Sequence, residues 1–114
     1  MSRSIATSIE NDLAILADRE AALEQACMAE AESRHAFDIK SAREFLNAEG
    51  TVDARKALAT LACDKEYLEH LKTKAVKEFT KAKWTDALQA VSAHQSILSA
   101  SVKGDFSHAI SGIG

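Results

Sequence analysis

The feature that most restricts the fold is a single glycine in the middle of a chain without proline. Only four of the 114 residues are glycine, and the three others lie at or beyond residue 104. Gly50 suits the C-terminus of a helix, because the left-handed conformation needed there costs glycine little. Thr51 can then cap a second helix with its hydroxyl, and Asp53 complements the positive end of that helix. The sequence therefore predicts two helices joined by a turn at residues 48–51.

Before this turn, over about residues 5–47, apolar residues recur at the three- and four-residue intervals of an amphipathic helix. Glu20, Glu30 and Arg34 fall on or beside the apolar stripe. The stripe is therefore a weak heptad that does not favour a tight parallel dimer. It consists of Ile5, Ile9, Leu13, Leu16, Leu23, Cys27, Phe37 and Phe45.

The second predicted helix, over about residues 52–103, carries two apolar sets in different registers. Because the two sets do not join smoothly, we expect a stutter, a bend or a change of packing partner between Phe79 and Trp84. Gly104 is expected to end this helix, so that residues 1–104 form one domain and residues 105–114 a flexible tail. The first set is Leu58, Leu61, Leu68, Leu71, Ala75 and Phe79, and the second is the cleaner heptad Trp84, Leu88, Val91, Gln95, Leu98 and Val102.

So short a turn returns the second helix beside the first, which gives a long antiparallel helical hairpin of the all-α class, similar to a coiled coil. Folding about Gly50 makes neighbours of residues whose numbers sum to roughly 98–101. Two helices alone cannot enclose both apolar stripes, so the hairpin is predicted to self-associate into a helical bundle, as a dimer or a tetramer. The predicted interface between copies comprises Trp84, Leu88, Val91, Leu98 and Val102.

A lysine-rich segment, "LKTKAVKEFTKAKW", lies between the two apolar sets. One hypothesis is a surface for single-stranded nucleic acid or another partner, in which lysines neutralise phosphates and an aromatic ring stacks on bases. The alternative is that the lysines pair with Asp18, Glu20 and Glu24, because residues 14–28 lie opposite in the predicted hairpin. Charge favours this pairing: residues 1–50 carry five basic and ten acidic side chains, and residues 51–114 carry nine and seven. The candidate binding residues are Lys72, Lys74, Lys77, Lys81, Lys83 and Trp84, the last of which is alternatively a core anchor.

No residues form a recognised catalytic or metal-binding motif. His35, Glu66 and His70 could meet across the hairpin as metal ligands, but ion-paired surface side chains explain the same pattern, and no metal or cofactor is predicted. Cys27 and Cys63 are expected to lie ~10–15 Å apart along the hairpin, too far for a disulfide, and are interpreted as buried thiols. No nucleophile has a base at a fixed spacing, so an enzyme is not predicted.

Charge and hydropathy restrict the class of protein further. A net charge of −3 argues against a protein that coats duplex DNA. The chain has no run of about 18 apolar residues, and its first residues lack the apolar core of a secretory signal. A cytoplasmic location without membrane contact is therefore expected.

Part of the chain resembles a group of small bacteriophage proteins described as coil-containing. The matching positions are an aromatic residue, Phe37, then Phe45-Leu46, the turn Glu49-Gly50-Thr51-Val52, the segment Arg55-Lys56-Ala57, and Leu61-Ala62. The resemblance implies a helical hairpin of phage or prophage origin, in genomes where such proteins lie among recombination and replication functions. The chain departs from that pattern in its second helix, which uses lysines in place of arginines and ends in the serine-rich "VSAHQSILSASVKG".

These observations lead to one main hypothesis and two alternatives. The main hypothesis is a non-enzymatic, oligomeric helical binding protein, an accessory factor in phage DNA recombination or replication that acts in the host cytoplasm. Its partner would be single-stranded DNA or a phage or host protein. The alternatives are a structural or assembly scaffold or adaptor with no nucleic-acid role, and a small inhibitor of a host protein that uses the acidic first helix to mimic nucleic acid.

Overall fold

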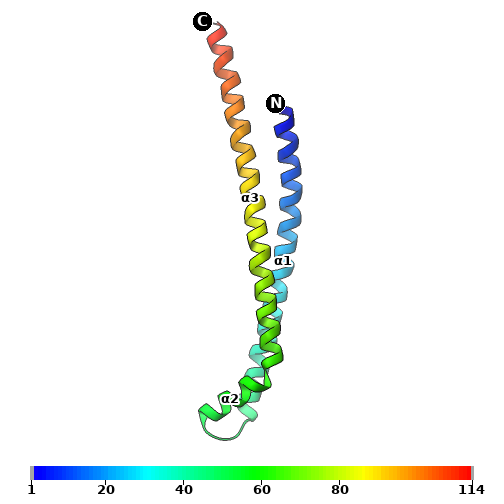
Figure 1. Cartoon of the computed structure of the whole chain (residues 1–114), viewed down its shortest axis with the longest axis vertical. Coiled ribbons are helices and arrows are strands. Elements are labelled where there is room, and N and C mark those ends of the chain that lie inside the picture. The colour runs from blue at the N-terminus through cyan, green and yellow to red at the C-terminus, as the bar shows by residue number, and fades with distance from the viewer. Residues whose placement is uncertain (1, 114) are drawn as a thin grey trace. The chain divides into compact units, whose positions relative to one another are not determined.

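The structure, a computed structural model, describes residues 2–113, with side chains for residues 4–103. The described residues form three helices and no strand: α1 (Ser2–Asn47), α2 (Val52–Ala62) and α3 (Asp64–Ile113) (Figure 1). The predicted all-α helical hairpin is confirmed. The chain divides into two compact units, each containing one stretch of α1 and one of α3. We call residues 22–80 the turn unit, and residues 2–21 together with 81–113 the end unit.

The turn forms as the sequence predicts. Helix α1 ends at Asn47 and α2 begins at Val52. Gly50 has a φ of 113°, a conformation that side-chain-bearing residues rarely adopt. Thr51 is the N-cap of α2, and its hydroxyl accepts a hydrogen bond from the Ala54 N–H at 3.2 Å. Both helix ends at the turn therefore follow from local backbone chemistry.

Gly50→Ala should lower the free energy of unfolding by about 1–2 kcal/mol, because an L-residue at this φ is strained. Urea unfolding followed by circular dichroism measures the change. Gly104→Ala is the matched control: it lies inside α3, where alanine is favoured over glycine by about 1 kcal/mol, so it should stabilise the protein. Equal effects of the two substitutions would contradict the turn geometry.

Arg55 joins the first turn of α2 to the end of α1. Its Nε donates a hydrogen bond to the Phe45 carbonyl at 3.1 Å, and its guanidinium lies 4.3 Å from the centre of the Phe45 ring. The hydrogen bond satisfies one of the carbonyls that the end of a helix leaves without a partner. Ala59, which is 4% exposed, packs on the inner side of α2. These contacts hold α2 against α1 within the turn unit.

The second helix is interrupted at Cys63, where the sequence predicts continuous helix over residues 52–103. Cys63 has φ −102° and ψ 13°, in the bridge region, although its N–H still bonds to the Ala59 carbonyl at 3.1 Å. Asp64 and Glu66 lie in the first turn of α3, where carboxylates stabilise the positive end of a helix. The interruption lets α2 turn aside from the direction of α3 at the turn of the hairpin (Figure 1).

Helix α3 extends further toward the C-terminus than predicted. It passes without a break through Phe79 and Trp84, and the division between the two compact units falls between them, at residues 80 and 81. It also continues past Gly104 to Ile113, so the helix end predicted at Gly104 is wrong. With no proline in the chain, a single glycine costs too little to end a helix on its own.

In each unit α1 and α3 run antiparallel and meet along a seam of buried and half-buried side chains at intervals of three and four residues. This is heptad spacing, but in the turn unit most of the seam residues are polar. The turn-unit seam comprises Leu23, Ala26, Glu30, Ser33, Phe37, Lys40 and Glu44 of α1 and Glu66, His70, Thr73, Lys77 and Thr80 of α3. The end-unit seam includes Asp12, Leu16 and Arg19 of α1 and Trp84, Ala87, Val91, His94 and Leu98 of α3.

The pairing register differs from the predicted one. The sequence places His35 near Glu66, but Glu66 pairs with Lys40, at 2.8 Å between Nζ and Oε1. Lys77 pairs with Glu30, which lies outside the predicted range 14–28. Because α2 turns aside at Cys63, pairing in α3 begins later along the chain. Each α3 residue therefore meets a later residue of α1 than a straight hairpin about Gly50 would give.

Candidate binding surfaces

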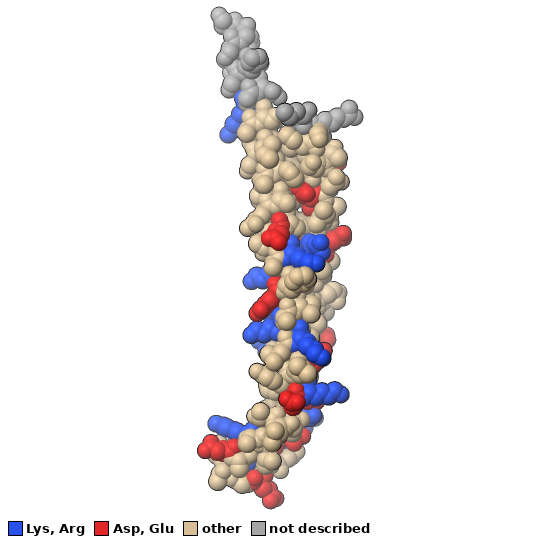
Figure 2. All heavy atoms as spheres, in the orientation of Figure 1, with Lys and Arg blue, Asp and Glu red and all other residues tan. Residues whose placement is uncertain are grey.

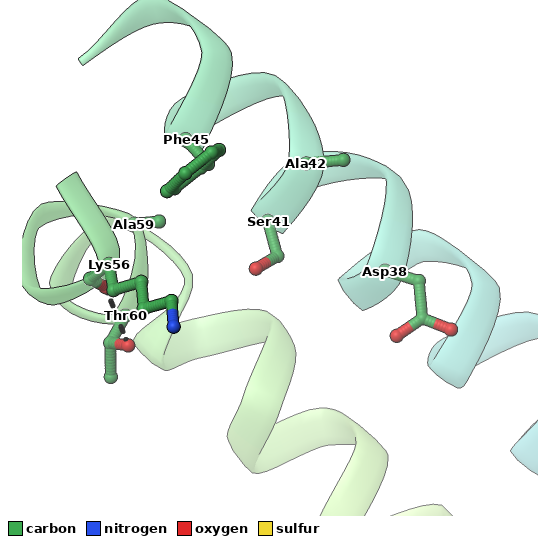
Figure 3. Close-up of a pocket in the computed structure, with 7 residues that line it drawn as sticks. All are labelled: Asp38, Ser41, Ala42, Phe45, Lys56, Ala59 and Thr60. Carbon is green, nitrogen blue, oxygen red and sulfur yellow. Dashed lines mark hydrogen bonds between the residues drawn. The ribbon is translucent and has the colours of Figure 1, made fainter. Parts of the chain in front are cut away.

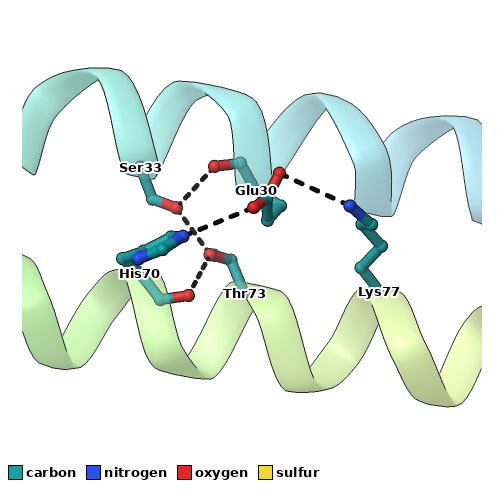
Figure 4. Close-up of polar contacts among 5 residues, drawn as sticks. All are labelled: Glu30, Ser33, His70, Thr73 and Lys77. Carbon is teal, nitrogen blue, oxygen red and sulfur yellow. Dashed lines mark hydrogen bonds and ion pairs between the residues drawn. The ribbon is translucent and has the colours of Figure 1, made fainter.

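A polar cluster occupies the middle of the turn-unit seam (Figure 4). Glu30 is only 8% exposed. Its Oε1 lies 3.3 Å from His70 Nε2, and its Oε2 lies 3.7 Å from Lys77 Nζ. Ser33 and Thr73 share a hydrogen bond of 2.5 Å across the seam, and the Thr73 hydroxyl also lies 2.9 Å from the His70 carbonyl. Five side chains from two helices thus satisfy one another where a coiled coil normally buries leucine.

A second ion pair lies nearer the turn. Lys40 and Glu66 pair at 2.8 Å, and the hydrogen bond between them raises the pKa of Lys40 and lowers that of Glu66. Cys63 is fully buried beside this pair, and burial raises the pKa of its thiol. The thiol is therefore held in its protonated form, which is a poor nucleophile.

The acidic members of the seam make the fold sensitive to low pH. The His70 hydrogen bond, followed by the charges of Lys77 and Arg34, lowers the pKa of Glu30 below its usual 4.5, and Lys40 does the same for Glu66. A lowered folded-state pKa means that the stabilisation is present at neutral pH and is lost as the pH falls below 4.5 through the folded values. The pKa of Lys40 is raised instead, so the stabilisation that this group contributes is lost only as the pH rises above 10.5.

Thermal unfolding should therefore give a Tm that is level between about pH 6 and 9 and falls steeply below about pH 4.5. The Glu30→Gln/Glu66→Gln double variant should have a lower Tm at pH 7 and a shallower fall in acid, since two of the titrating groups are gone. Scanning calorimetry across this range measures both. An unchanged acid slope in the double variant would show that these two carboxylates do not carry the dependence.

In the end unit the seam combines two polar pairs with an apolar centre. His94 Nδ1 contacts Asp12 Oδ2, and the Trp84 indole N–H lies 3.4 Å from Glu20 Oε1. Val91 is 5% exposed. Trp84 is half-buried in this seam, which agrees with the core-anchor interpretation of the sequence rather than with a fully exposed stacking residue.

The candidate lysines are not alike. Lys72 and Lys74 of the turn unit are exposed, whereas Lys77 is half-buried and paired with Glu30. Lys81 and Lys83 of the end unit are also exposed. Figure 2 shows basic and acidic side chains interspersed on the face drawn, without a broad basic patch. The predicted pairing of lysines with α1 carboxylates is thus seen for Lys77, with Glu30 in place of Asp18, Glu20 or Glu24.

The predicted interface between copies does not form a single exposed face. Val91 lies in the seam of its own chain, so it is not available to another copy, and Trp84 and Leu98 are half-buried there. Leu88 and Val102 are exposed. The reason is that the seam within the chain already takes up Trp84, Val91 and Leu98.

The apolar set predicted for the start of the second helix points away from α1. Its members are spaced like a seam, but the residues that α3 turns toward α1 are Glu66, His70, Thr73 and Lys77. All its members are exposed to solvent, Ala75 among them. The exposed fractions of the larger side chains are 50% for Leu58, 75% for Leu61, 51% for Leu68, 41% for Leu71 and 62% for Phe79. Sequence periodicity found this set but could not indicate which way it faces.

A shallow pocket of about 510 Å³ lies between the end of α1 and α2 (Figure 3). Phe45, Ala42 and Ala59 give it apolar walls, and Asp38 and Lys56 supply one charge of each sign. The Thr60 hydroxyl donates to the Lys56 carbonyl at 2.9 Å. Ser41 also lines the pocket, so it combines three apolar side chains with four polar ones.

The remaining candidate residues are separated by the fold. Cys27 is exposed and Cys63 is buried, both as thiols, so the predicted burial is confirmed for Cys63 and wrong for Cys27. His70 contacts Glu30 and Glu66 contacts Lys40, so these two and the exposed His35 do not form one cluster. Within the described residues no group of three or more histidine, cysteine or acidic side chains is arranged to hold a metal ion.

The fold and these surfaces define an all-α helical hairpin whose seam is mostly polar in the turn unit and whose described surface carries sixteen exposed large apolar side chains among charged ones. No protein-family model, curated protein or solved structure matches the chain. None of its helices, over the residues described, has the length and apolar character needed to cross a bilayer.

Proposed function

We propose that the protein is a non-enzymatic helical binding protein that works as an oligomer. The observation that carries this proposal is the distribution of apolar side chains in the described part of the chain. Four apolar residues are buried, namely Ala26, Ala59, Cys63 and Val91, while sixteen large apolar side chains are at least 40% exposed. Exposed apolar surface on this scale is typical of proteins that bury it against another chain.

The biological setting that we propose is an accessory role in phage DNA recombination or replication. The resemblance of the turn and its flanking helices to small phage coil-containing proteins supports this setting. The seam supports a binding role rather than a catalytic one, because its titratable side chains are occupied by one another. A scaffold or adaptor for phage or host proteins would use the same exposed apolar surface.

Binding of single-stranded DNA is a second candidate function, supported by one stripe of α3. Lys72, Val76 and Phe79 recur at intervals of four and three and so share one side of the helix, and all three are exposed. An exposed ring beside lysines is the arrangement on which bases stack.

Light scattering at several protein concentrations, with and without a labelled single-stranded oligonucleotide at ~0.1 M salt, tests both functions. We expect a mass of two or more chains at every concentration. A further increase with the oligonucleotide, abolished by Lys72→Glu/Lys74→Glu but not by Lys56→Glu on α2, would support DNA binding. A folded monomer at all concentrations would contradict the oligomeric proposal.

A further inference from the structure

The outer face of α3 in the turn unit carries a stripe of exposed apolar side chains outside the seam. We define it by Leu68, Leu71, Ala75 and Phe79, which recur at intervals of three and four residues and are all exposed. His70 and Lys77, two residues beyond Leu68 and Ala75, lie in the seam. Two residues correspond to about 200° around a helix, so the outer face points almost directly away from α1.

The occupant best suited to this face is a second copy of the same chain. The seam of the turn unit is mostly polar, so covering the outer face would add the apolar burial that the seam lacks, and a second copy is present wherever the chain is. The charge of this segment also favours a second copy, since residues 64–80 carry four basic and four acidic side chains. Two copies therefore meet without net repulsion, whereas a polyanion gains little from a neutral stretch.

We propose that two copies pack antiparallel through their outer faces, with the twofold axis between residues 73 and 74. In this arrangement Leu68 lies beside Phe79 of the second copy. The aliphatic stem of Lys72 lies over the small Ala75 of the second copy, and its ammonium reaches solvent. A parallel arrangement would instead place Lys72 against Lys72 of the second copy, where like charges repel. The two α3 helices are then adjacent, and each α1 lies on the far side of its own α3, so the four helices follow the order α1, α3, α3, α1.

This inference rests on the proposed oligomeric function, and sedimentation equilibrium separates the two. Ala75→Arg introduces two bulky cations at the centre of the interface and should raise the dimer dissociation constant roughly 100-fold or more. Ala31→Arg makes the same change at an exposed position of α1 and should leave the dimer intact. A monomeric wild-type protein would contradict both proposals. A dimer that Ala75→Arg does not weaken would contradict only the proposed face.

Disulfide trapping tests the arrangement without requiring that Ala75→Arg fold. Leu68→Cys and Phe79→Cys are made separately in a Cys27→Ser background, since Cys27 is exposed and Cys63 is fully buried. The two variants are then refolded together and oxidised. The antiparallel dimer should give disulfide-linked chains only in the mixture, because residue 68 of one copy lies roughly 16 Å from residue 68 of the other.

The other results of this experiment each count against the proposal. Linkage of each variant with itself would indicate a parallel dimer. No linkage in any sample would exclude the face as an interface. Linkage of the mixture only when single-stranded oligonucleotide is present, with no linkage of the protein alone, would mean that nucleic acid and not the outer face brings the copies together.

Discussion

Val91→Asp should unfold the end unit, with a loss of about 3 kcal/mol or more in the free energy of unfolding. Val91 is 5% exposed at the centre of the end-unit seam, where a carboxylate would lose its hydration. Urea unfolding at pH 7, followed by circular dichroism, measures the loss. The helical signal of the variant should also fall before denaturant is added, since the end unit has no other buried large apolar residue among those described.

Val102→Asp is the matched control for this change. Val102 lies on the same helix and is 55% exposed, so the same substitution should alter the free energy of unfolding by no more than about 0.5 kcal/mol. Equal losses in the two variants would mean that Val102 is also buried, as in the interface that the sequence predicts. A small loss in Val91→Asp would contradict the seam register of the end unit.

Replacing the polar cluster of the turn unit with apolar residues should stabilise the hairpin. The variant Glu30→Leu/His70→Leu/Lys77→Met removes all three charged or titratable members together, and we expect its Tm to rise by roughly 10 °C. A coiled-coil seam gains more from apolar packing than from an ion cluster that has to be dehydrated. Scanning calorimetry at pH 7 measures the change.

The single variant Glu30→Leu is the contrasting case. It leaves His70 and Lys77 facing a seam without their carboxylate, so its Tm should fall below that of the wild type. A triple variant less stable than the single one would show that the cluster is not an electrostatic unit. Light scattering on the triple variant shows whether the apolar seam still specifies one oligomer, because polar seam residues are known to fix register.

The helix ends at the turn were predictable because they depend on a few adjacent residues. Gly50, Thr51 and Asp53 act through local backbone conformation and short hydrogen bonds, and each is found in its predicted role. The interruption at Cys63 was missed because no glycine or proline marks it. The acidic start of α3 at Asp64 and Glu66 was the available signal, and it was masked by the helix-forming residues on both sides.

The surfaces were less predictable than the helices because periodicity carries no direction. Leu68, Leu71 and Phe79 were identified as one face, yet which face meets α1 depends on pairings such as Glu30 with His70, formed by residues 40 apart in sequence. The usual assumption that the more apolar face turns inward is wrong for the turn unit. Whether its exposed apolar face meets a second chain is the subject of the trapping experiment.

The contacts that join the helices differ in the number of residues between their two members. This separation predicts the order in which the contacts form. The separation is 10 residues for Arg55 and Phe45 and 26 for Lys40 and Glu66, and in the end unit it reaches 64 for Trp84 and Glu20 and 82 for His94 and Asp12. Because closing a longer loop costs more entropy, pairing should start at the turn and proceed toward the termini. During synthesis the whole of α1 is made before any of its α3 partners, so the N-terminal end of the first helix waits the longest for its partner.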